Sequence, residues 1–135
     1  MSEKKVVIIT GAAQGIGFAG AKRFAKGGYI VILADRNKEK LDNAVTALKE
    51  EGYEAVGYEL DVTDYEQGQK VVNSVAEKYG RIDALFNDAG ITGHRKNVLN
   101  FDPVEIKQAE DVNLWGSLYM IQHVARVFVE KKIKG

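Results

Sequence analysis

The sequence predicts an α/β fold in which a parallel β-sheet of about four strands is covered by helices on both faces. Two observations carry this prediction. Short runs of β-branched residues alternate with longer segments whose apolar residues recur at helical spacing. The first run, at residues 6–9, is apolar without interruption, as in a parallel strand buried on both faces. Because crossovers between parallel strands are right-handed, we expect a doubly wound sheet with strand order 3-2-1-4.

Each element has a start or stop signal of its own. The predicted strands cover residues 6–9, 29–34, 54–60 and 82–86. The first predicted helix, residues 15–26, stops at a glycine pair, and the second is capped by Asn37 and stops at Gly52. A capping-box pattern at residues 63–66 begins the third helix, which ends at Gly80.

The last quarter of the chain is predicted to hold a loop and a long helix. Residues 87–100 are polar and rich in turn formers, so we expect a loop there. Asp102 and Pro103 are a helix cap followed by proline at the first helical position. Residues 104–132 keep helical spacing, with a break expected near Asp111.

Size and composition exclude several classes of function. The 135 residues fit one domain, and 19 basic and 19 acidic residues give a formal net charge of zero, which does not favour nucleic acid or an anionic membrane. There is no cysteine for a disulfide or a metal site. His94 and His123 are too far apart for a helical metal pair, so no metal is expected. The first apolar run is too short for a signal peptide or a membrane span, so we expect a cytoplasmic protein.

A glycine-rich turn at residues 10–17 follows the first strand and opens the first helix. In that context, glycines allow the backbone to approach a phosphate closely, and the helix N-terminus supplies free N–H groups and partial positive charge. The alternative is a tight turn whose glycines are incidental. We favour a Rossmann-type site for the pyrophosphate of a dinucleotide. The turn residues expected at the cofactor are Gly11, Gln14, Gly15, Ile16 and Gly17.

An acidic residue at the end of the second strand indicates which cofactor is bound. Asp35 follows Gly17 by eighteen residues, and a carboxylate there accepts hydrogen bonds from ribose hydroxyls and repels a 2′-phosphate. Arg36 is either a partner for a 2′-phosphate or a solvated surface residue. Gln14 is uncharged and adds no phosphate clamp. We therefore expect NAD as the cofactor, with NADP as the less favoured alternative.

Four motifs in order resemble the short-chain dehydrogenase/reductase family: T-G-x-x-x-G-x-G at residues 10–17, D-V-T at 61–63, N-D-A-G at 87–90 and V-N-L-W-G at 112–116. The resemblance implies that the second and third motifs also contact the cofactor, through Asp61, Val62, Asn87, Ala89 and Gly90. It implies that Asn113 is the active-site asparagine. Asp88 departs from the family's second asparagine. Since a carboxylate accepts but does not donate, we expect sheet packing near the cofactor to differ there.

The family's chemistry, as the resemblance implies it, is hydride transfer between a nicotinamide and an alcohol or carbonyl carbon. It uses a serine and a Tyr-x-x-x-Lys pair, whose lysine lowers the pKa of the tyrosine. No tyrosine of this sequence has lysine four residues later. We therefore expect the cofactor-binding part of a longer oxidoreductase, inactive by itself. The alternative is a non-catalytic nucleotide-binding fragment, or a folding or assembly module.

Without a fifth strand, the fourth strand would form an exposed edge. Residues 82–86 are mostly apolar and would present unpaired backbone groups. We therefore expect a homo-oligomer, formed through this edge or through the apolar face of the last helix.

Overall fold

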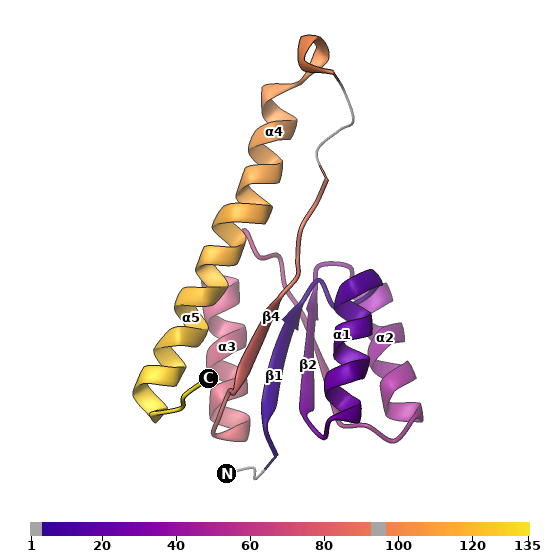
Figure 1. Cartoon of the computed structure of the whole chain (residues 1–135), viewed down its shortest axis with the longest axis vertical. Coiled ribbons are helices and arrows are strands. Elements are labelled where there is room, and N and C mark those ends of the chain that lie inside the picture. Colours follow the sequence, from indigo (N-terminus) through magenta and orange to yellow (C-terminus); the bar gives the residue numbers. More distant parts are fainter. Residues whose placement is uncertain (1–3, 93–96) are drawn as a thin grey trace.

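The computed structural model describes residues 4–92 and 97–135. Its sheet has four parallel strands in the order β3-β2-β1-β4, which confirms the predicted fold class and strand order (Figure 1). The strands are β1 (Val6–Thr10), β2 (Ile30–Asp35), β3 (Ala55–Glu59) and β4 (Ala84–Asn87). Thr10 lies opposite Ala34 on one side and Asn87 on the other, so three strands end at the same level.

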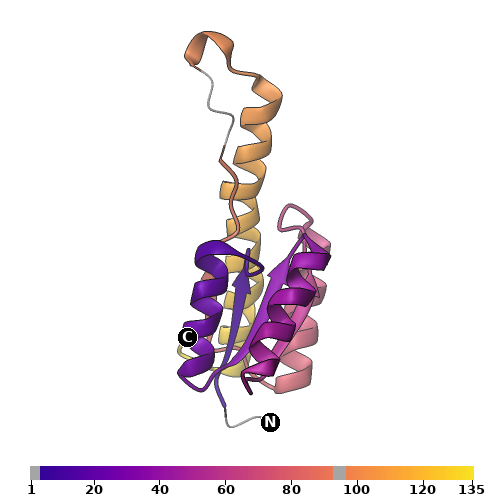
Figure 2. The ribbon, with the colours of Figure 1, turned by 90° about the vertical axis from the view of Figure 1, so that its right-hand side faces the viewer.

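Helices cover both faces of the sheet, because alternate residues of the central strands point to opposite sides. Val6 and Ile8 belong to a core shared with α3 (Tyr65–Tyr79) and α5 (Ser117–Lys131). Val7 and Ile9 belong to a second core with α1 (Gly15–Lys26) and α2 (Lys38–Glu50). Figures 1 and 2 show the two helix pairs on opposite sides of the sheet.

The strand β4 begins later than predicted because Asp83 contacts β1 partly through its side chain. The Asp83 carboxylate accepts the Val6 N–H at 2.8 Å, and the Asp83 N–H donates to the Val6 carbonyl at 2.8 Å. Arg81 donates to the same carboxylate through Nε at 2.8 Å. Burial by itself raises the pKa of Asp83, but the hydrogen bonds from Arg81 and Val6 outweigh it, so its pKa lies below the ordinary value.

The expected break near Asp111 is a change of helix type. The helix α4 (Pro103–Glu110) passes into a π-helical stretch, η2 (Asp111–Gly116), and then into α5, with right-handed helical backbone angles at both junctions. Together, α4, η2 and α5 form one long helical rod, and its α4 end extends beyond the sheet (Figures 1 and 2).

The predicted loop at residues 87–100 contains structure at both ends. Asn87 is the last residue of β4, and a short 3₁₀ helix, η1 (Val98–Asn100), precedes α4. Residues 93–96, and His94 with them, lie outside the described residues. No helix in the described part of the chain is long and apolar enough to cross a membrane.

Candidate functional site

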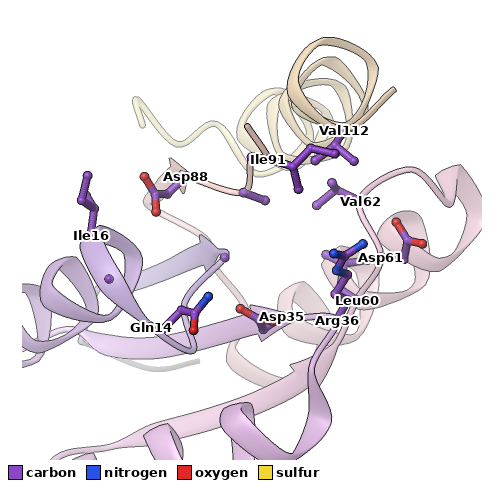
Figure 3. Close-up of a pocket in the computed structure, with 14 residues that line it drawn as sticks. Gln14, Ile16, Asp35, Arg36, Leu60, Asp61, Val62, Asp88, Ile91 and Val112 are labelled. Atoms are coloured by element: carbon purple, nitrogen blue, oxygen red, sulfur yellow. The ribbon is translucent and has the colours of Figure 1, made fainter. Parts of the chain in front are cut away.

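A cleft of about 530 Å³ opens at the carboxyl ends of β1, β2 and β4, where winding of the sheet reverses direction (Figure 3). It brings together ten of the residues that the sequence predicts at the cofactor. These are Gly11, Gln14, Gly15, Ile16, Asp35, Arg36, Asp61, Val62, Ala89 and Gly90. Segments from four separate stretches of the chain therefore meet in one place.

The glycine turn forms one wall of this cleft, and two of its glycines have backbone angles that favour glycine. Gly11 has φ of 62° and Gly15 has φ of 59°. A methyl group added at Gly15 would meet no atom within 4 Å, so the space above Gly15 is open. Gly17 is buried, and a Cβ there would collide with the Gly11 carbonyl oxygen. The turn therefore folds closely onto the start of α1 and leaves the cleft side free.

The Asp35 carboxylate is held in a fixed position at the end of β2. Its Oδ2 accepts the Ala13 N–H at 3.1 Å, and its Oδ1 accepts the Asn37 N–H at 2.9 Å. An ionised carboxylate has about four acceptor positions, so two of them remain available to a ligand. Asp35 thus joins the glycine turn to the start of α2 and still offers hydrogen-bond acceptors to the cleft.

Asp61 and Val62 form the opposite wall, directly after β3. Asp61 Oδ1 accepts the Thr63 N–H at 3.0 Å and the Thr63 hydroxyl at 2.7 Å. Val62 is packed against the long helical rod, because a Cβ at Gly116 would lie 2.6 Å from Val62 Cγ2. The absence of a side chain at Gly116 therefore lets the rod approach this wall closely.

Asn87 acts inside the structure and does not line the cleft. Its side-chain amide donates to the Ser117 carbonyl at 2.9 Å, and its Oδ1 lies 3.3 Å from the Thr10 hydroxyl oxygen. The same hydroxyl accepts the Ala89 N–H at 3.0 Å. These bonds fix the segment after β4 against β1 and α5. Gly17 is also outside the cleft lining, and it packs against the backbone of Gly11 in the turn.

Asn113 lies in the π-helical stretch and contacts the cleft through another residue. Its Nδ2 donates to the Ile91 carbonyl at 2.8 Å, and its Oδ1 accepts the Ile91 N–H at 2.8 Å. Its Oδ1 is also 3.2 Å from an ideal Cβ on Gly90. A π-helical turn inside a longer helix is often found at a functional site.

Four lining residues were not among the predicted site residues: Leu60, Asp88, Ile91 and Val112. Leu60 ends the third predicted strand, so its place before Asp61 was a usable signal. Asp88 projects toward the side of the cleft near Ile16 (Figure 3). Val112 lies in the π-helical stretch, and Ile91 is held beside that stretch by Asn113, so periodicity alone does not reveal that either lines the cleft. Within the described ranges, no group of three or more His, Asp and Glu residues could hold a metal ion.

Comparisons with known proteins identify the family. The family model described as "short chain dehydrogenase" matches residues 5–135. A diacetyl reductase of Staphylococcus epidermidis is 34% identical over 131 residues, which are 97% of this chain and 51% of that protein. The chain thus spans about half the length of the curated relatives it matches.

Solved structures agree with this match. NAD+-bound xylitol dehydrogenase aligns with a TM-score of 0.92 and 34% identity over 96% of this chain and 50% of that one. An actinorhodin polyketide ketoreductase with NADPH aligns with a TM-score of 0.91 and 30% identity, again over 96% and 50%. With the ordered motifs, the sheet order and the family match in agreement, this chain belongs to the short-chain dehydrogenase/reductase family of oxidoreductases.

Proposed function

We propose that this chain binds a nicotinamide dinucleotide in the cleft at the ends of β1 and β4, and that it prefers NAD to NADP. The observation that carries the proposal is the joint position of the glycine turn and Asp35 on one cleft. The open space above Gly15 fits a pyrophosphate beside the N-terminus of α1. The similar structures, one with NAD+ and one with NADPH, support a nicotinamide cofactor of either kind.

Asp35 supports the preference for NAD. Two backbone N–H groups hold its carboxylate at the cleft, where its free acceptor positions suit ribose hydroxyls. Its negative charge opposes a 2′-phosphate. At the other wall, Oδ2 of Asp61 suits the exocyclic amine of adenine, while Val62 supplies apolar contact.

In the whole protein we propose oxidation of an alcohol or reduction of a carbonyl compound. The bound nicotinamide supplies the hydride acceptor or donor. Through its two bonds to Ile91, Asn113 would hold the segment that follows β4 near the reacting end of the cleft. The sequence given has no Tyr-x-x-x-Lys pair, and we expect these 135 residues alone to bind cofactor without transferring hydride.

A thermal-shift titration of the chain with NADH tests cofactor binding. At a ligand concentration of a hundred times the dissociation constant, binding to the folded state adds about 2.7 kcal/mol to the free energy of unfolding. We expect a concentration-dependent rise in the unfolding temperature with NADH and a smaller rise with NADPH at equal concentration. An unfolding temperature that does not respond to either nucleotide contradicts the proposal.

We also propose that the chain forms a homo-oligomer and that it is cytoplasmic. β4 is one of the two edge strands of the described sheet, and Leu118 and Ile121 are about half exposed on α5, at 45% and 51%. Light scattering of the purified chain tests the association. A single monomer mass at working concentration contradicts it.

A further inference from the structure

A closed circuit of hydrogen bonds joins the glycine turn to the start of α2 beside Asp35. Asp35 accepts the N–H groups of Ala13 and Asn37. The Asn37 side chain, which caps α2, accepts the Lys40 N–H at 3.0 Å. The Lys40 ammonium then extends from α2 to the glycine turn and donates to Gln14 Oε1 at 2.8 Å. The circuit therefore places a lysine at the rim of the cleft, on the residue that follows Ala13.

The charge of that lysine is not cancelled by its partner. Gln14 is neutral, and the Lys40 ammonium forms no ion pair in the part of the chain that the structure describes. Lys38, two residues earlier on the same helix, differs in this respect because it pairs with Asp42 at 3.2 Å. An ammonium group forms a stronger hydrogen bond to a charged acceptor than to a neutral amide oxygen. Lys40 is thus an available cation beside the cleft.

Gln14 and Arg36 lie on opposite sides of Asp35 (Figure 3). Lys40 is bound to Gln14 on one side of Asp35, and Arg36 lies on the other side. A negative group that entered beside Asp35 would meet a positive charge on either side of it. Asp35 is the acidic residue that would oppose such a group there.

We propose that Lys40 is a determinant of cofactor choice that acts against Asp35. The inference rests on the proposed function, since it concerns the ribose end of the same dinucleotide site. When a neutral residue replaces Asp35, Lys40 leaves the Gln14 amide and binds a phosphate on the ribose 2′-oxygen. The preference for NAD then depends on a single carboxylate, and the cation needed for NADP is already in place.

The experiment compares the dissociation constants of NAD+ and NADP+ by calorimetric titration of the 135-residue chain. The background is Asp35→Ser, which removes the charge and leaves room for a phosphate. Three further variants are made in that background: Lys40→Gln, Lys40→Arg, and Lys38→Gln as the matched control from the same helix. Lys38 and Lys40 are both exposed, so each substitution removes one surface charge from the start of the same helix.

We expect Asp35→Ser to bind NADP+, and the added Lys40→Gln to raise the ratio of the NADP+ to the NAD+ dissociation constant about tenfold. Lys40→Arg should restore that ratio, whereas Lys38→Gln should leave it unchanged. Equal ratios for Lys40→Gln and Lys38→Gln in a chain that still binds NAD+ overturn this inference alone. A wild-type chain that binds no NAD+ overturns the proposed function and this inference with it.

Discussion

Asn113 and Ile91 are joined by a pair of hydrogen bonds, in which the side-chain amide of the first donates to and accepts from the backbone of the second, both at 2.8 Å. The pair connects the π-helical stretch to the segment that follows β4, across 22 positions of sequence. Ile91 lines the cleft, whereas Asn113 does not. Asn113 is therefore a positioning residue for the cleft wall in the described structure.

Replacing Asn113 with leucine, which keeps the branched shape of the side chain but cannot form hydrogen bonds, should loosen that wall. Both hydrogen bonds are lost, and at about 1 kcal/mol each the free energy of unfolding falls by about 2 kcal/mol or less, since the bonds are exposed. The dissociation constant for NADH should rise by severalfold because Gly90 and Ile91 are no longer held. Chemical denaturation and NADH titration measure the two effects. Unchanged NADH affinity would show that the segment keeps its position without Asn113.

Replacing Asp88 with asparagine should tighten cofactor binding. The Asp88 carboxylate lines the cleft, and its Oδ2 is 3.0 Å from an ideal Cβ on Gly17, in the first turn of α1. A pyrophosphate at that helix N-terminus meets this negative charge. NADH affinity should rise about threefold at low ionic strength, and the gain should shrink as salt screens the charges. An affinity that is the same for both chains at low salt would contradict this electrostatic role.

Neutralising Asp83 should destabilise the fold in a way that depends on pH. The pKa of Asp83 is lower in the folded chain than its ordinary value, so its contribution is fully present above about pH 4 and is lost as pH falls through the folded-state pKa. Asp83→Asn should lower the free energy of unfolding by about 1–3 kcal/mol at pH 7, because Arg81 and the Val6 N–H lose a charged acceptor. The difference from wild type should shrink below pH 4. A difference of equal size at pH 3 and pH 7 would assign the effect to packing.

His123 should make the fold sensitive to mild acid. Burial between α3 and α5 lowers its pKa, with Arg126 acting in the same direction and the bond to the Tyr65 carbonyl opposing them. The unfolded chain, with a histidine pKa of about 6.5, therefore binds a proton that the folded chain resists. Stability should fall as pH drops below about 6.5, and His123→Phe should flatten that part of the curve. Parallel curves for the two chains between pH 5 and 7 would contradict the assignment.

The strands and their order could be predicted because an uninterrupted apolar run such as residues 6–9 is typical of a parallel strand that is buried on both faces. The observed β4 begins two residues later than the predicted strand, because the Asp83 side chain replaces a regular strand contact with Val6. Such a contact depends on where the fold places a backbone N–H group 77 positions away, and local sequence does not contain that position.

The sequence identified residues that line the cleft where a residue type has one local reason to be present. Gly11 and Gly15 have positive φ, and Asp35 stands at the end of a strand. It did not identify Ile91 and Val112, whose place in the cleft depends on the π-helical turn and on the close approach of Gly116 to Val62. The bond between Lys40 and Gln14 likewise joins residues that only the fold brings together.

The central claim is that the cleft beside the glycine turn binds NAD, and a matched pair of glycine substitutions tests it most directly. Gly15 and Gly28 both have positive φ, 59° and 88°, and a Cβ at either meets no atom within 4 Å. Only Gly15 lines the cleft, whereas Gly28 follows the far end of α1. Alanine at either position should cost about 1–2 kcal/mol of stability through backbone strain.

The decisive measurement is the NADH dissociation constant of Gly15→Ala and Gly28→Ala. It is made at a low temperature at which both variants are folded. We predict that Gly28→Ala binds NADH as the wild type does, and that Gly15→Ala loses binding by at least about tenfold because its methyl group occupies the phosphate position. Equal affinity of the two variants, or no binding by the wild type, would contradict the account.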